Sequence, residues 1–251
     1  MTPDSTEAIV LRTTPFAEAD VVVHLVTSSH GRIGAFARAA RRSRRRFRGG
    51  LHPFALLRVT LAPRRSGDLW SLRDSETLDA RPGIGADLHR MAAGSRLLDL
   101  LLHSLQDGEG GGIAFERIRR FLDWLDRETR GPAVLEAGLH RMELLLLGHL
   151  GLLPDLHASA RSGQDAGGLP EPCWLPGVGI IDAAERLPGE SASPLGGDGL
   201  AYLHAIAEGS FRRAEDHDAR RRTRDALDRQ WRDLLGRDLQ SRPFYREIFG
   251  A

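Results

Sequence analysis

The feature that most constrains the fold of this chain is a change in hydrophobic period near residue 80. Before that point, short apolar runs recur about every ten residues, with Gly, Pro and Ser between them; they cover residues 8–11, 21–27, 33–38, 54–61 and 69–72. Short β-branched runs at this spacing predict strands. Five strands within about seventy residues fit a five-stranded barrel of the oligonucleotide-binding (OB) type.

After residue 80 the apolar residues follow helical spacing. Amphipathic or apolar helices are predicted over residues 85–106, 113–130, 133–150, 200–207 and 219–235. Residues 154–198 are rich in Gly, Pro and Ser and predict an irregular segment with one β-hairpin, its strands around Cys173 and residues 179–182. We therefore expect an α+β multidomain chain: an OB barrel over residues 1–80, a helical bundle in two parts over residues 81–153 and 199–251, and an inserted segment over residues 154–198.

An arginine-rich segment lies inside the predicted barrel. Seven of the eleven residues from Arg38 to Arg48 are arginine, although the whole chain has a formal net charge of only +1. Such a local concentration of charge attracts a polyanion, and the phosphate backbone of nucleic acid is the usual one. A solvated loop or a disordered basic arm is the alternative.

Aromatic residues accompany this segment. On a surface that binds single strands, aromatic rings stack on bases while arginines follow the phosphates. Phe36 and Phe54 fit the core of the barrel better, and Phe16 also lies in the β region. Phe47 lies within the arginine-rich segment and is the better candidate for stacking.

A second group of arginines falls on the predicted helix over residues 219–235. Arg220, Arg221, Arg222 and Arg224 are followed by acids at spacings close to one helical turn. This pattern is typical of a solvated, ion-paired helix face. A second basic contact surface is the alternative.

Signs of catalysis are weak. The chain has no lysine, which excludes a phosphate-loop lysine and a Schiff-base lysine, and its Gly-rich pieces lack the spacing of a dinucleotide fingerprint. A nucleophile at Cys173 would need a positioned histidine. We therefore expect no enzymatic activity and no cofactor. No stretch is long and apolar enough to span a membrane, no secretory signal is evident, and a lone cysteine suits a reducing cytosol, so we expect a cytoplasmic protein.

Several motifs resemble those of the RecO family of bacterial recombination mediators. They are EAIVLR at residues 7–12, EAD at 18–20, HGR at 30–32, the arginine-rich stretch at 37–49, LHPF at 51–54 and the ending at 237–244. The order of barrel, helices, inserted segment and helices is also similar along nearly the whole chain. The N-terminal motifs are the specific part of the resemblance.

The resemblance implies a function in recombinational repair. Proteins of this family bind single- and double-stranded DNA, anneal complementary strands, associate with RecR and help RecA to replace single-strand-binding protein. They also recognise the acidic C-terminal tail of single-strand-binding protein through the helical domain. The matching phosphate contacts here are Arg32, Arg38, Arg41, Arg42, Arg44, Arg45, Arg46 and Arg48. Arg220, Arg221, Arg222 and Arg224 are candidates for the acidic tail. Association with the nucleoid follows from DNA binding.

One departure concerns a metal. Many relatives carry a zinc module with two Cys-x-x-Cys pairs after the central helix. Here the first pair is replaced by Ser159 and Ser162, and only Cys173 could represent the second. His157 and Cys173 would supply two ligands at most. We expect no structural zinc, and an inserted segment held by packing, for example around Trp174.

Two other functions fit the same residues. The arginines could dock an acidic protein tail in a non-catalytic adaptor, with DNA binding incidental. An OB barrel could also bind RNA. Competition between an acidic peptide and DNA, and relative affinity for RNA and DNA of one sequence, separate these alternatives.

Overall fold

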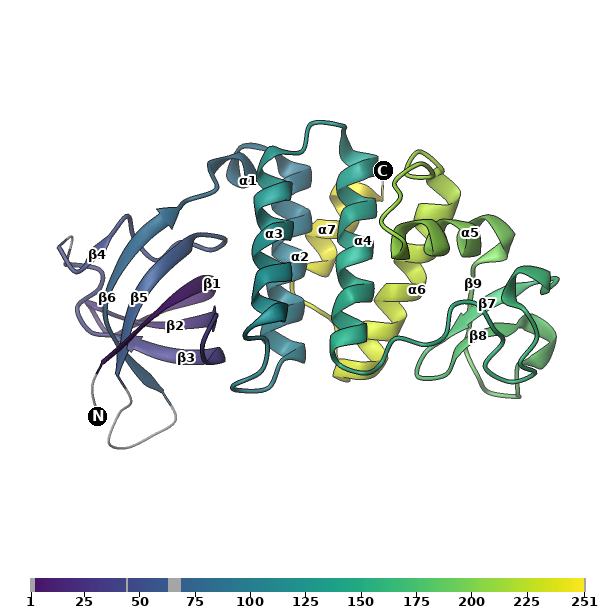
Figure 1. Ribbon diagram of the computed structural model, residues 1–251, viewed down its shortest axis with the longest axis horizontal. Helices are drawn as coiled ribbons and strands as arrows, with labels where there is room; N and C mark the ends of the chain where they lie inside the picture. The colour runs from purple at the N-terminus through teal and green to yellow at the C-terminus, as the bar shows by residue number, and fades with distance from the viewer. Residues whose placement is uncertain (1–2, 44, 63–68, 251) are drawn as a thin grey trace. The chain divides into compact units, whose positions relative to one another are not determined.

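The computed structural model describes residues 3–43, 45–62 and 69–250 (Figure 1). By the contacts between its residues, the chain divides into two compact units, Met1–Arg127 and Glu128–Ala251. The N-terminal unit holds the barrel and three helices, and the C-terminal unit holds four helices and a small sheet. The finer boundaries at residues 80, 153 and 198 stay predictions.

The N-terminal strands form a closed barrel, as the sequence predicts. They are β1 (Asp4–Phe16), β2 (Asp20–Thr27), β3 (Gly31–Ala37), β5 (Leu56–Ala62) and β6 (Trp70–Asp79). Antiparallel pairing joins β3 to β2, β2 to β1, β1 to β5 and β5 to β6, and a parallel pairing of β3 with β6 closes the barrel. This strand order is that of an OB barrel. A two-residue strand, β4 (Phe47–Arg48), pairs in parallel with β6 and was not predicted.

Alternation along the strands fills the barrel. On β3 the residues Ile33, Ala35 and Ala37 point inward and are at most 4% exposed, while those between them face outward. Because successive side chains of a strand point to opposite faces, this pattern fixes which residues are left on the outer surface. The outer face of β2 and β3 therefore carries Val22, His24, Arg32 and Phe36 in partly exposed positions. The prediction that Phe36 lies in the barrel core is wrong, because its neighbours Ala35 and Ala37 take the inward positions.

Three helices complete the N-terminal unit: α1 (Pro82–Ala86), α2 (Leu88–Ser104) and α3 (Ile113–Arg127). Arg81 follows the last strand of the barrel and is 1% exposed, and its side chain links α3 to the loop before β5. Its guanidinium donates to Asp123 Oδ1 of α3 at 2.9 Å and to the carbonyl of Phe54 at 2.5 Å. The first two long helices predicted from the sequence are confirmed, with later starts or earlier ends than expected. The short helix α1 was not predicted.

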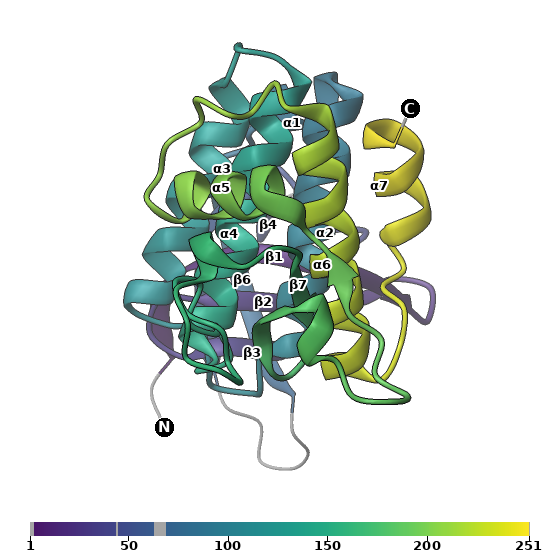
Figure 2. The same cartoon turned by 90° about the vertical axis from the view of Figure 1, so that its right-hand side faces the viewer.

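The C-terminal unit is built on α4 (Pro132–His149), α5 (Gly196–Ala207), α6 (His217–Leu235) and α7 (Arg242–Phe249). The C-terminal helix α7 was missed by the sequence reading; it lies beside α6 (Figure 2), where Arg246 donates to Asp228 at 2.7 Å. The inserted segment contains β7 (Pro172–Leu175), β8 (Gly179–Asp182) and β9 (Ser193–Pro194), in the order β8-β7-β9. The predicted hairpin is thus confirmed as β7 and β8.

The inserted sheet is fixed to α6 through Trp174. This side chain has no exposed surface, and its indole Nε1 donates to Gln230 Oε1 at 3.0 Å. The same oxygen accepts the backbone N–H of Gly177 at 3.1 Å. Packing around Trp174 therefore holds the segment, as expected from its sequence. Across the described ranges, no helix combines the length and hydropathy that crossing a bilayer demands.

Candidate nucleic-acid interface and arginine-lined cavity

We call residues 38–48 the arginine segment. It leaves β3, turns, and re-enters the barrel as β4. The turn is held against the β1–β2 turn, because the Ala39 N–H donates to Asp20 Oδ1 at 2.7 Å and the Arg41 N–H donates to the carbonyl of Ala19 at 3.0 Å. The described part of the segment is therefore anchored to the barrel at both ends and does not hang free as a basic arm.

Most described arginines of this segment face solvent. The exposed ones are Arg38, Arg41, Arg42, Arg45 and Arg46. Glu18 is the acid beside them, and its carboxylate accepts from Arg42 at 3.0 Å in a pair whose side chains are 70% and 87% exposed. Such an exposed pair is weak and exchanges readily for another anion. Arg44 lies outside the described residues, and so does the side chain of Arg48.

The structure buries one predicted DNA contact and engages a second in an ion pair. Phe47 is 4% exposed and lies in the barrel core, because the pairing of β4 with Ser75 of β6 turns its ring inward. A ring in that position offers no face for a base. Arg32 has an 18% exposed side chain and pairs with Asp107 at 2.7 Å, so its charge is already neutralised within the N-terminal unit.

The arginines of α6 divide into two sets. Arg220 and Arg224 point into the C-terminal unit, where their Nε atoms donate to the two carboxylate oxygens of Glu136 at 2.9 and 2.6 Å. Glu136 is fully buried, and Tyr245 also donates to it. Burial by itself raises the pKa of Glu136, but His140 and Arg224 outweigh it and hold the pKa below its ordinary value. Arg220 and Arg224 are therefore structural, which corrects their predicted role in binding an acidic tail.

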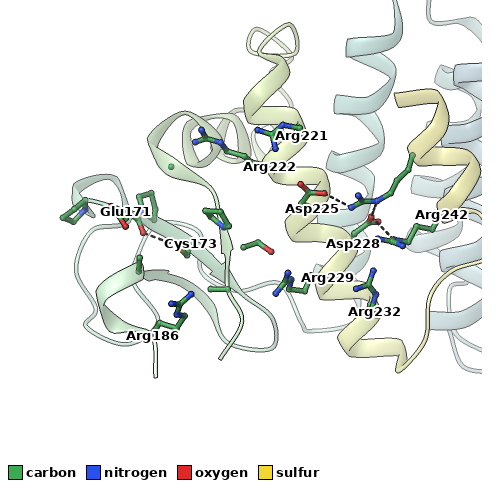
Figure 3. Close-up of a pocket in the computed structure, with 18 residues that line it drawn as sticks. Glu171, Cys173, Arg186, Arg221, Arg222, Asp225, Asp228, Arg229, Arg232 and Arg242 are labelled. Atoms are coloured by element: carbon green, nitrogen blue, oxygen red, sulfur yellow. Dashed lines mark hydrogen bonds and ion pairs between the residues drawn. The ribbon is translucent and has the colours of Figure 1, made fainter. Parts of the chain in front are cut away.

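Arg221 and Arg222 lie instead at a cavity of about 900 Å³ between α6, α7 and the inserted sheet (Figure 3). We call it the arginine cavity. Its walls carry Glu171, Asp225 and Asp228 against seven arginines, an excess of four positive charges. The seven are Arg186, Arg221, Arg222, Arg229, Arg232, Arg242 and Arg246. Pro172, Cys173, Ala183, Ala192 and Pro194 add apolar surface.

Two of the three acids of this cavity, Asp225 and Asp228, bind arginines of α7. Asp228 accepts from Arg246 at 2.7 Å and from Arg242 at 3.2 Å, and Asp225 accepts from Arg246 at 2.6 Å. Arg222 instead donates to the carbonyl of Leu195 at 3.1 Å, which leaves its charge uncompensated. The cavity therefore offers positive charge beside apolar surface. Sequence reasoning missed Arg186 in this site, because the inserted segment that carries it meets α6 and α7 only in the folded chain.

Ser159 and Ser162, the two serines at the positions expected to match a Cys-x-x-Cys pair, take part in a hydrogen-bonded link. Ser159 Oγ donates to Glu185 Oε2 at 2.7 Å and accepts the backbone N–H groups of Arg161 and Ser162, both at 3.2 Å. Glu185 also accepts the Asp182 N–H at 2.9 Å. We call this the serine–glutamate link.

The other candidate ligands are occupied as well. The ring of His157 stacks on that of His204, with centroids 4.4 Å apart, and Cys173 is 7% exposed with its thiol directed to the carbonyl of Glu171. Burial raises the pKa of the Cys173 thiol, which opposes the thiolate that zinc requires. Within the described ranges no three His, Cys, Asp or Glu side chains gather where they could hold a metal. These residues do not fit a zinc module.

Comparison with known proteins covers nearly the whole chain. The family described as Recombination protein O N terminal matches residues 1–81, and Recombination protein O C terminal matches residues 85–243. A DNA repair protein RecO of Anaeromyxobacter sp. (strain K) is 35% identical over 245 residues, which cover 96% of this chain and 94% of the relative. That of Myxococcus xanthus is 30% identical over 243 residues, 96% of each chain.

Proposed function

Since the chain belongs to the RecO family of DNA repair proteins, we propose that its arginine segment binds single-stranded DNA and anneals complementary strands. The observation that carries this proposal is the set of exposed arginines on a turn anchored to the barrel, with the exposed Glu18 carboxylate beside them. Arginine suits this task because its planar guanidinium binds phosphate through two hydrogen bonds.

The proposed mechanism is electrostatic and needs no cofactor or catalysis. The arginines replace the counterions of two strands, so the repulsion that keeps the strands apart is reduced and base pairing follows. Binding of double-stranded DNA uses the same contacts. We further propose, from the family, that the protein associates with RecR and helps RecA to replace single-strand-binding protein, in the cytoplasm and at the nucleoid.

The test is annealing of two labelled complementary oligonucleotides, together with the salt dependence of binding. The variant carries Arg38→Ala, Arg41→Ala, Arg42→Ala and Arg45→Ala. A matched control loses the same charge through Arg58→Ala, Arg117→Ala, Arg120→Ala and Arg127→Ala, all at exposed positions. We expect the first variant to lose annealing and to lower the slope of log affinity against log salt by about 3, at roughly 0.7 for each lost contact to a single strand. Equal slopes for the two variants would contradict the proposal.

We propose a second role for the arginine cavity, the binding of an acidic peptide tail such as that of single-strand-binding protein. Its excess of four positive charges and its apolar residues support a ligand that has both carboxylates and apolar side chains. Arg222→Ala and Arg229→Ala together should weaken binding of a fluorescent acidic peptide, whereas Arg213→Ala, at an exposed site that does not line the cavity, should not.

Competition separates this arrangement from a pure adaptor. If the tail and DNA occupy different sites, an acidic peptide that fills the arginine cavity does not displace DNA from the arginine segment. If the peptide displaces DNA and neither the wild-type protein nor the variant of the arginine segment anneals strands, the adaptor function replaces the mediator function.

A further inference from the structure

An exposed aromatic residue stands at the end of β1. Phe16 is 55% exposed, and every other described Phe, Tyr and Trp side chain is buried or half-buried. Its ring meets that of Phe36 edge to face, with centroids 5.6 Å apart and planes at 80°. An apolar ring left in water forgoes the stabilisation that burial would bring, and this pair leaves one ring largely uncovered.

The pair lies on the outer face of the barrel. Phe36 alternates on β3 with Ala35 and Ala37, which are fully buried, so its ring is directed outward. Its neighbour across the sheet is Val22 of β2, which in turn pairs with Thr14 of β1. The face formed by the second and third strands is the one that OB barrels use for oligonucleotides.

The same hydrogen bonds that anchor the arginine segment bring it to Phe16. Phe16 is followed directly by the β1–β2 turn, and that turn holds the segment through Ala19, Asp20 and Glu18. The guanidinium of Arg41 donates to the carbonyl of Glu18 at 3.2 Å, and that of Arg42 binds its carboxylate. Two cations and an exposed ring therefore share one short stretch of surface, although 24 positions of sequence or more separate them.

We propose that Phe16, supported by Phe36, stacks on an unpaired base of a strand whose phosphates lie on Arg41 and Arg42. This rests on the proposed DNA binding by the arginine segment and adds a selectivity for single strands to it. A single strand presents the π-faces of its bases, whereas a duplex hides them between neighbouring base pairs. Phe16 thereby takes the stacking role that the burial of Phe47 rules out.

The test compares three probes of equal length: a single-stranded oligothymidylate, a strand of abasic sugar phosphates, and a duplex. Phe16→Ala should weaken binding of the oligothymidylate by about 10-fold and leave the other two unchanged, because only the first offers a base to the ring. Phe16→Trp should restore the affinity. Ile113→Ala, at a residue of the same unit that is 75% exposed, removes an exposed apolar side chain without affecting any probe.

The outcomes distinguish this inference from the function on which it rests. If the variant with four arginines replaced loses affinity for all three probes while Phe16→Ala changes none, the arginine segment binds DNA and the stacking site is wrong. If Phe16→Ala weakens the binding of all three probes equally, the ring maintains the shape of the turn and does not contact a base. That result also overturns the inference. If the wild-type protein binds no probe, the proposed function itself fails.

Discussion

Replacement of Glu136 by alanine is the perturbation whose energy the structure defines best. Glu136 lies on α4 with no exposed surface, and it is the common partner of two α6 guanidiniums whose side chains are 11% and 5% exposed. Tyr245 of α7 donates its hydroxyl to the same carboxylate at 3.1 Å. One carboxylate therefore joins three helices of the C-terminal unit.

The expected loss is large because Glu136→Ala leaves two cations with little access to water and no counter-charge. Removing one partner of a buried ion pair costs about 3–5 kcal/mol, most of it the cost of the remaining unpaired charge. For a chain of this length, this corresponds to a fall in Tm of roughly 6–20 °C. Replacing an exposed carboxylate that has a similar ion-pair distance should cost much less free energy of unfolding.

Asp238 provides that comparison, since it pairs with Arg232 at 2.7 Å while the two side chains are 56% and 45% exposed. Asp238→Ala should cost less than about 1 kcal/mol. Chemical denaturation followed by circular dichroism measures both. If Glu136→Ala and Asp238→Ala lower the free energy of unfolding equally, burial does not set the strength of the Glu136 cluster and the reasoning is refuted.

Three further predictions concern stability. Because the folded-state pKa of Glu136 is lowered, its ionised carboxylate stabilises the fold above the ordinary carboxyl pKa, and this stabilisation is lost as the pH falls below about 4.3. Glu136→Gln should therefore flatten the acid part of a plot of unfolding free energy against pH. An unchanged curve would contradict the role of the ionised Glu136. Ser159→Ala should cost about 2 kcal/mol by leaving two N–H groups without an acceptor, whereas overnight chelation should leave the wild-type Tm unchanged. Gly31→Ala should cost about 2 kcal/mol or more, because Gly31 has a φ of +61° and a Cβ there would lie 2.2 Å from the Gly108 carbonyl; Gly85→Ala, with nothing within 4 Å, is the control in urea denaturation.

The barrel and the main helices could be predicted because each is encoded locally. The run from Val21 to Thr27 is rich in β-branched residues, which favours a strand, and the observed strand β2 differs from it by one residue. The arginine segment was found in the same way, from composition alone. What could not be predicted depends on partners distant in sequence.

Phe47 illustrates this limit. Four flanking arginines make its surroundings look solvent-exposed, yet its burial follows from a pairing with Ser75 that no local pattern reveals. Arg220 and Arg224 are similar, since their partner Glu136 lies 84 and 88 positions earlier. One signal was available: Glu136 and His140 stand one helical turn apart in a largely apolar helix, and a charged residue among apolar ones predicts a buried counter-charge.

The serine–glutamate link determines which chemical conditions the inserted segment withstands. A thiolate cluster opens when its sulfurs are oxidised or its metal is withdrawn, but a hydroxyl donating to a carboxylate has neither vulnerability. The link responds to acid instead, because hydrogen bonds from Ser162 and Ser159 hold the pKa of Glu185 below its ordinary value and protonation would remove an acceptor. The inserted sheet should therefore keep its shape in the presence of peroxide or of a zinc chelator.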